Sequence, residues 1–255
     1  STNPSSVLDG NIDQFIEDAF EFDVDALCDG KEVFIAGIMQ HIEEAGVHSG
    51  DSSCVIPPYD MSDKIKKDII DMTTKLALEL NVIGLINLQF AVKGNEAYVL
   101  EVNPRSSRTV PFVSKYSNVP LANIAAQLSV GKKLKDFNLE ENNFNHIAVK
   151  KAVLPFKKFK NEKVFLGPEM KSTGEVMGID SEPGMAFLKA MQSDGYTVPN
   201  EGTAFVSISD IDKKRALPII RDLATLNFTI IATKGTAVFF TDNGIECTSI
   251  FKVGE

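Results

Sequence analysis

The sequence has few cysteines and no long apolar run, and these absences exclude several classes of protein. Its 255 residues include three cysteines, an odd number without metal-ligand spacing: Cys28, Cys54 and Cys247. Free thiols in a reducing compartment are therefore expected. No apolar run reaches the roughly 18 residues of a membrane span, and the start STNPSSVLDG lacks the regions of a signal peptide. The sequence predicts a cytoplasmic protein without a membrane partner.

Positive charge is scarce as well. Lys and Arg total 26 against 35 Asp and Glu, which gives a formal net charge of -9. A nucleic-acid partner needs a net basic face, so nucleic acid is excluded as the main partner, whereas a local cationic pocket for one nucleotide is not. The 44% hydrophobic content is enough to bury a core in one large domain or two small ones.

Hydrophobic periodicity predicts two regions of different architecture. The first region begins with a hairpin over 20–42, a loop over 45–62 and a helix over 63–80. Two strands follow over 84–92 and 96–103, then a second helix over 119–134 and a third strand over 147–156. It ends with a turn-rich segment over 166–179 and a short helix over 185–195. The second alternates strand and helix over 202–209, 212–227, 228–233 and 237–244. This alternation predicts a small parallel sheet. We place the domains at 1–181 and 182–255, with the boundary region over 182–196.

The strands 84–92 and 96–103 flank a Gly-Asn turn and form a second hairpin. Matching their apolar faces places Leu88 opposite Val102 and Phe90 opposite Leu100. A slip of one residue would bury polar groups, so the pattern disfavours it. The same register places the polar residues of the two strands on the other face.

These polar residues end in a group with a specific chemistry. Gln89, Glu101 and Asn103 share one face and offer one carboxylate and two amide oxygens, which suit Mg²⁺ or Mn²⁺. Arg105 and Arg108 follow directly, and guanidinium groups match the geometry of phosphate. The spacing indicates a metal–triphosphate site. From spacing alone, a solvated sheet face with a surface Glu and two surface Arg remains equally open.

Longer motifs resemble one known family. The run NLQFAVKGNEAYVLEVNPRSSRTVPFVSK, with HIEEAGVHSGDSSCVIPPY upstream and KSTGEVMG downstream, resembles the large subunit of carbamoyl phosphate synthetase, an ATP-grasp enzyme. The resemblance covers nearly the whole chain. It implies an α/β and α+β fold: the C-terminal lobe of an ATP-grasp domain, with an antiparallel or mixed sheet and helices, then a small parallel-sheet domain similar to methylglyoxal synthase, incomplete at both ends.

The resemblance also implies roles for individual residues. Asn103, Arg105 and Arg108 would act in catalysis on the phosphates, and Gln89, Glu101 and Asn103 would hold Mg²⁺ or Mn²⁺. ATP would be bound by Ile16, Glu21, Gly46, Val47, His48, Ser49, Gln89 and Glu101. The remaining histidines, His41 and His146, are expected to be packed or surface residues.

Allosteric residues follow from the same resemblance. A site for uridine or inosine monophosphate (UMP or IMP) would comprise Ser207, Lys213, Thr233, Thr236 and Lys252. Without the resemblance, turn hydroxyls and surface lysines would be the favoured interpretation. Glu43 and Asp51 match carboxylates that bind ornithine in bacterial relatives, but Lys151 stands where those relatives have a glutamate. We expect ornithine activation to be weak or absent, since a cation there repels the amine of ornithine.

The implied activity is ATP-dependent phosphorylation of carbamate to carbamoyl phosphate, for pyrimidine or arginine biosynthesis. Implied substrates and partners are ATP, bicarbonate or carbamate, a separate or fused glutaminase, and further copies in an oligomer. We expect this chain alone to be inactive, since the lobe with the glycine-rich loop would lie upstream. The alternatives are another ATP-grasp ligase, such as a biotin carboxylase or purine-pathway enzyme, and a non-catalytic nucleotide-binding module.

Overall fold

The structure is a computed structural model that describes residues 16, 19–43, 45–140, 144–158 and 165–252. The chain forms two compact units, Ser1–Tyr196 and Thr197–Glu255. The helix α4 (Pro183–Ser193) belongs to the first unit because it packs against strands β6 and β7. The boundary between the units in the sequence therefore lies at the C-terminal end of the 182–196 region. The helix α4 belongs to the first unit and not, as the division at 181/182 implies, to the second.

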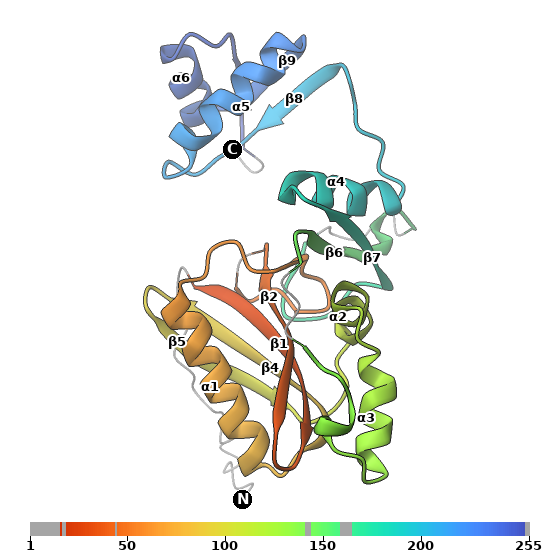
Figure 1. The fold of residues 1–255 in the computed structure, drawn as a ribbon. Helices are drawn as coiled ribbons and strands as arrows, with labels where there is room; N and C mark the ends of the chain where they lie inside the picture. Colours follow the sequence, from red (N-terminus) through yellow and green to blue (C-terminus); the bar gives the residue numbers. More distant parts are fainter. Residues whose placement is uncertain (1–15, 17–18, 44, 141–143, 159–164, 253–255) are drawn as a thin grey trace, which may run out of the picture. The chain divides into compact units, whose positions relative to one another are not determined.

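The first unit is built on a seven-stranded sheet in the order β5-β4-β1-β2-β3-β6-β7 (Figure 1). Every pairing in this sheet is antiparallel. The strands are β1 (Phe20–Asp29), β2 (Val33–His41), β3 (Cys54–Ile56), β4 (Ile83–Lys93), β5 (Glu96–Asn103), β6 (Ile147–Val153) and β7 (Gly174–Asp180). Short 3-10 turns cover Leu134–Asp136 and Pro155–Lys158.

Alternation along β1 divides the sheet into two faces. Phe22 and Val24 point to the face that α1 (Asp63–Glu79) covers. Leu27 points to the opposite face, under α2 (Val110–Ser117) and α3 (Leu121–Ser129) (Figure 1). Earlier in β1, the residues on this second face are acidic: Glu21, Asp23 and Asp25. The second face is therefore apolar under α2 and α3 and polar beyond them.

The register of the central hairpin matches the prediction in part. Gln89 pairs with Glu101, and Leu88 pairs with Val102, as expected. Phe90 pairs with Val99 rather than Leu100, so that detail of the prediction is wrong. β5 has a bulge at Leu100, which has no partner on β4. The extra residue is accommodated because β5 is an edge strand of the sheet.

Three elements differ from the sequence expectations. β3 lies within the predicted loop and bridges β2 and β6, while β7 lies within the predicted turn-rich segment and pairs along its length with β6. α2 was not predicted at all. Tertiary pairing decides the two strands, because β3 has only three residues and the sequence around β7 is rich in turn formers.

The second unit has the predicted parallel sheet, in the order β10-β9-β8. Its elements are β8 (Gly202–Val206), α5 (Lys213–Thr225), β9 (Phe228–Thr233), α6 (Lys234–Asp242) and β10 (Thr248–Ile250). Ile230 and Phe240 are central to its own apolar core. The expected fold class, an antiparallel sheet with helices followed by a small parallel sheet, is confirmed. Among the described residues, no helix combines the length and apolar character of a membrane span.

Candidate functional site

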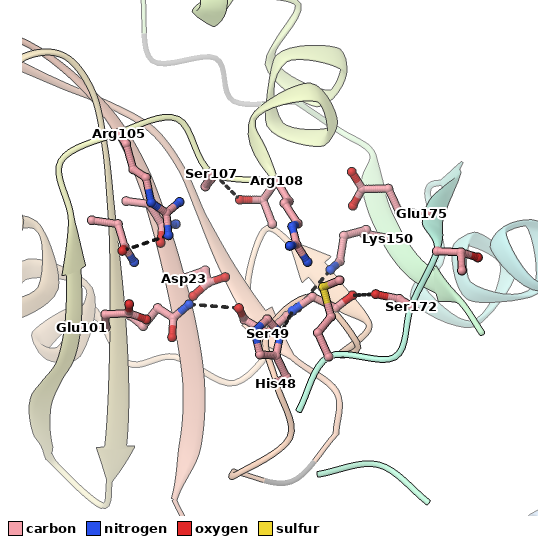
Figure 2. A pocket seen from close by; sticks show the side chains of 18 residues that line it. Asp23, His48, Ser49, Glu101, Arg105, Ser107, Arg108, Lys150, Ser172 and Glu175 are labelled. Carbon is pink, nitrogen blue, oxygen red and sulfur yellow. Dashed lines mark hydrogen bonds between the residues drawn. The ribbon is translucent and has the colours of Figure 1, made fainter. Parts of the chain in front are cut away.

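A cavity of about 560 Å³ lies in the first unit, over the polar part of the sheet face that α2 and α3 leave uncovered. β1, β4 and β5 form its floor, and loops before β3, after β5 and before β7 form its walls. Figure 2 shows Glu101 on one side, Lys150 and Glu175 on the other, and Arg108 between them. The cavity is therefore lined by both acidic and basic groups.

Two rows of polar residues cross the floor. Strand pairing places Gln89 between Asp23 and Glu101 in the first row. In the second row it places Asn87 between Asp25 and Asn103. The structure thus brings together Gln89, Glu101 and Asn103 as the hairpin register requires.

The oxygen atoms on this floor suit a hard divalent cation. Nε2 of Gln89 donates to Oγ of Ser49 at 3.0 Å, which fixes the side chain and leaves its carbonyl oxygen for another partner. Oδ1 of Asn103 accepts from Nη2 of Arg105 at 3.0 Å. One carboxylate and two amide oxygens fit Mg²⁺ or Mn²⁺, which typically take few protein ligands and complete their shell with phosphate and water. Among the described residues, no cluster of three or more His, Cys, Asp or Glu side chains could hold a metal by itself.

Cationic side chains line the opposite side of the cavity. Lys150 is 1% exposed, and its Nζ donates to the backbone oxygen of Ser49 at 3.2 Å. Among the described residues, the Arg108 guanidinium has no hydrogen-bond partner, and it approaches Gly50, where a side chain would crowd it. Burial raises the pKa of Glu175 although the positive charges of Lys150, Lys115 and Arg108 oppose the shift. This wall can receive an anionic ligand.

The loop over 46–51 connects the floor to the wall. The backbone N–H of Gly50 donates to Nδ1 of His48 at 3.0 Å, and the N–H of His48 donates to the carbonyl of Gly167 at 2.9 Å. His48 and Ser49 line the cavity, whereas Val47 does not. The structure therefore places two of the four predicted loop residues directly at the site.

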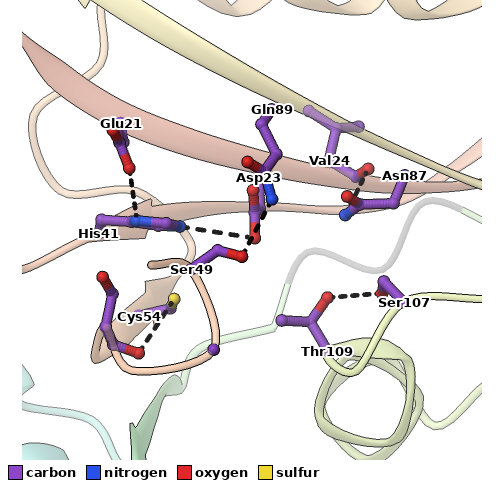
Figure 3. A network of polar contacts seen from close by, with 12 residues as sticks. Glu21, Asp23, Val24, His41, Ser49, Cys54, Asn87, Gln89, Ser107 and Thr109 are labelled. Carbon is purple, nitrogen blue, oxygen red and sulfur yellow. Dashed lines mark hydrogen bonds and ion pairs between the residues drawn. The ribbon is translucent and has the colours of Figure 1, made fainter. Parts of the chain in front are cut away.

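Glu21 takes part in a buried network beside the floor, on the same face of the sheet as Asp23 (Figure 3). His41 Nδ1 lies 3.2 Å from Glu21 Oε2, and His41 Nε2 lies 3.5 Å from Asp23 Oδ2. Burial opposes a charged ring, but Cys54, Asp23 and Glu21 outweigh it and raise the pKa of His41 well above its ordinary value. Glu21 also accepts the N–H of Gly46 at 3.0 Å. Glu21 and Gly46 do not line the cavity, and the half-buried Ile16 does not line it either.

A second buried network centres on Asp25, which is 0% exposed. Its Oδ1 accepts from Nδ2 of Asn87 at 3.0 Å and from Oγ of Ser107 at 2.7 Å, and its Oδ2 accepts from Oγ1 of Thr109 at 2.5 Å. Burial raises the pKa of Asp25 to about 6 even though these three hydrogen bonds lower it. Figure 3 shows Ser107 and Thr109 joined beside Asn87.

Sequence reasoning missed Asp23, Asn87 and Lys150, which line the cavity, and Asp25, which lies next to Asn87 beneath it. One signal was available: FEFDVDA alternates acidic with apolar residues on a strand that pairs over ten residues with the predicted ligand strand. Three carboxylates on one face of a central strand would have indicated a site. Lys150 carries no such signal, because it stands beside a second lysine, Lys151, in an otherwise apolar strand.

The predicted ornithine residues lie apart from the cation wall. Oε2 of Glu43 accepts the N–H of Ser53 at 2.5 Å. Asp51 accepts the N–H groups of Lys171 at 2.7 Å and Ser172 at 2.8 Å. Burial favours the neutral Asp51, but the hydrogen bonds from Ser172 and the backbone outweigh burial and lower its pKa. Lys151 pairs at 2.6 Å with Asp194, the C-cap residue of α4, so its charge is partly neutralised. The response to ornithine stays a prediction.

In the second unit, four of the predicted allosteric residues meet at the start of α6. Oγ1 of Thr233 lies 3.5 Å from Oγ of Ser207 and donates to Oγ1 of Thr236 at 3.3 Å. Nζ of Lys213 donates to the carbonyl of Gly235 at 2.9 Å. The hydrogen bond and charge of Lys213, and to a smaller extent the charge of Lys252, lower the pKa of Asp210.

A cavity with a carboxylate and amide oxygens on its floor, and guanidinium and ammonium groups on its wall, is typical of the class of proteins that bind a phosphate-bearing ligand together with a divalent cation. The match to protein families agrees with this class. Residues 6–137, slightly more than half of the chain, match the family described as "Carbamoyl-phosphate synthase L chain, ATP binding domain", and residues 215–255 match the MGS-like domain. The chain belongs to the carbamoyl phosphate synthase large-chain family.

Curated relatives support the same family over nearly the whole chain. The carbamoyl phosphate synthase large chain of Archaeoglobus fulgidus is 55% identical over 246 residues. Those of Acidobacterium capsulatum and Methanobrevibacter smithii are each 53% identical, over 252 and 247 residues. Each alignment covers 96% of this chain but 23% of the relative. The chain therefore spans about a quarter of the length of the relatives that it matches.

Proposed function

We propose that this chain is the part of a carbamoyl phosphate synthase large chain that binds Mg-ATP and phosphorylates carbamate. In this reaction a carbamate oxygen attacks the γ-phosphorus of ATP, the bond from that phosphorus to the β–γ bridging oxygen breaks, and ADP leaves. The observation that carries the proposal is the cavity, where Gln89, Glu101 and Asn103 face Arg108 and Lys150.

Phosphoryl transfer needs positioning and charge neutralisation more than covalent help from the protein. Gln89, Glu101 and Asn103 would hold Mg²⁺ or Mn²⁺, and such a cation neutralises charge on the phosphates. Arg105 and Arg108 would contact phosphate oxygens, and the buried Lys150 would add a fixed positive charge where solvent is excluded. No nucleophilic side chain is required for this chemistry.

The parent enzyme would act in the cytoplasm with a separate or fused glutaminase that supplies ammonia, and its product would feed pyrimidine or arginine synthesis. The cluster of Ser207, Lys213, Thr233 and Thr236 at the start of α6 supports a regulatory site for UMP or IMP. We propose that this site regulates the parent enzyme. That the isolated chain is inactive stays a prediction.

The test is Glu101→Gln in the full-length protein. The substitution removes the only carboxylate of the proposed ligand set and keeps its shape, so ATP-dependent carbamoyl phosphate formation should fall by more than about 100-fold. Glu96→Gln is the matched control, because Glu96 lies on the same strand and bonds the hydroxyl of Tyr98 outside the cavity. Wild-type turnover by Glu101→Gln, with both variants folded, would contradict the proposed function. Loss of turnover in both would show that the effect is not local.

A further inference from the structure

We propose that Asp25 is a positioning residue that holds Arg108 at the cavity, an inference that rests on the proposed function because it treats Arg108 as a phosphate-binding group. Asp25 does not line the cavity. It lies in the middle of β1, beneath the point where the loop over 104–109 leaves β5 and enters α2. Its effect on the reaction would therefore pass through that loop.

The two residues that flank Arg108 are both tied to the same carboxylate. Ser107 donates to one oxygen of Asp25 at 2.7 Å, and Thr109 donates to the other at 2.5 Å. Their hydroxyls also lie 2.8 Å from each other. With both neighbours fixed toward the sheet, the backbone at Arg108 is fixed as well. Arg108 itself is exposed and lines the cavity.

Thr109 shows that this anchoring takes precedence over local helix stability. Thr109 is the N-cap residue of α2, where a threonine oxygen usually accepts a backbone N–H of the first turn. No such bond is present, and the hydroxyl donates to Asp25 instead. The helix therefore lacks its side-chain cap while the loop before it is anchored to the sheet.

The anchor also links the loop to the metal-binding strands. Oδ1 of Asp25 accepts from Nδ2 of Asn87, and Asn87 pairs across the strands with Asn103. One buried carboxylate thus joins β1, β4 and the loop that carries the arginines. Charge-assisted hydrogen bonds of this kind are about twice as strong as neutral ones, so the arrangement is suited to hold a loop in one conformation.

The experiment is a double-mutant cycle in the full-length protein, with Mg-ATP affinity measured by calorimetry. Asp25→Asn and Arg108→Ala should each weaken Mg-ATP binding by about 10- to 100-fold, the loss expected for one charge-assisted hydrogen bond. Their combination should be no weaker than Arg108→Ala alone, because Asp25 acts through Arg108. Wild-type affinity in Asp25→Asn, or losses that multiply in the double variant, would overturn the proposal.

Two further comparisons separate positioning from general stability. Asp29→Asn removes another buried carboxylate of β1, which accepts the N–H groups of Lys31, Glu32 and Leu134, and it should leave Mg-ATP affinity unchanged. Thr109→Ser keeps the hydroxyl and should bind like wild type, whereas Thr109→Val should bind about 10-fold more weakly. The two Thr109 variants test the proposal even if Asp25→Asn does not fold. Equal Mg-ATP affinity in Thr109→Ser and Thr109→Val would contradict it.

The result can be told apart from failure of the proposed function. If the wild-type protein binds no Mg-ATP, the proposed function is wrong, and the position of Arg108 is then compared in crystal structures of wild type, Thr109→Ser and Thr109→Val. Positioning by Asp25 predicts a displaced or disordered Arg108 only in Thr109→Val. An unmoved Arg108 in that variant would refute the inference independently of any activity.

Discussion

At the residue scale, buried carboxylates are the feature that the sequence reveals least. Gln89, Glu101 and Asn103 could be predicted because the hairpin register follows from the alternation of apolar residues. The alternation FEFDVDA places Asp25 on the same face, but its hydrogen-bond partners could not be predicted, since they lie in distant segments: Thr109 is 84 positions along the chain from Asp25. A local pattern reports which face a side chain occupies, but it does not report which donors meet it there.

Burial of Asp25 predicts a pH dependence of stability. Its pKa is raised from 3.8 to about 6 in the folded chain, so the folded state holds the proton more tightly than the unfolded state. The resulting stabilisation is fully present below the unfolded pKa, near pH 4, and is lost as the pH rises through about 6. Relative to Asp25→Asn, the wild type should lose up to about 3 kcal/mol of unfolding free energy between pH 4 and pH 7.

Urea unfolding at several pH values measures this difference, and other titrating groups cancel in the comparison. Asp29→Asn provides a control of opposite sign. Burial acts against a charged Asp29, but the N–H groups of Leu134, Glu32 and Lys31 outweigh burial and lower its pKa. The stability from Asp29 should therefore be present above its unfolded pKa and lost as the pH falls. A pH-independent difference for Asp25→Asn would contradict the assignment.

At the element scale, long periodic segments were predictable and short bridging ones were not. The helix expected over 63–80 is α1, and its N-cap residue, Ser62, accepts the N–H of Ile65 at 3.3 Å. β3 forms between two partners, β2 and β6, and β7 forms along β6, so both strands depend on tertiary pairing. The bulge in β5 likewise depends on the geometry of an edge strand, which no alternation pattern encodes.

Packing of α4 on β7 gives a prediction at this scale. A Cβ at Gly178 would overlap the backbone of α4 at Ala186 and Ala190, which cannot move aside as a flexible side chain can. Gly178→Ala should therefore lower the unfolding free energy of the first unit by at least about 1–3 kcal/mol. Gly174→Ala on the same strand is the control, because nothing lies within 4 Å of its added Cβ. Equal melting temperatures of the two variants would show that α4 does not pack as described.

At the scale of the whole molecule, the division into two folding patterns was visible in the sequence, but the boundary was not sharp. The alternation of strand and helix after residue 202 predicted the parallel sheet of the second unit. α4 reads as a helix in either unit, and only its contacts with β6 and β7 assign it to the first. The resemblance to the large-chain family came from motifs such as GVHSGD and RTVPFVSK, and the family match and the curated relatives confirm it.

The two units also predict two separable ligand sites in the full-length protein. Lys213→Ala removes the ammonium group beside Gly235 at the start of α6, so it should abolish UMP binding while leaving Mg-ATP affinity within about twofold. Glu101→Gln should do the reverse, because the cavity floor contains no residue of the second unit. Calorimetric titration of each variant with both nucleotides measures this. Each site is assembled from residues of one unit only, so the two sites are expected to be independent. A single variant that loses both ligands would contradict this.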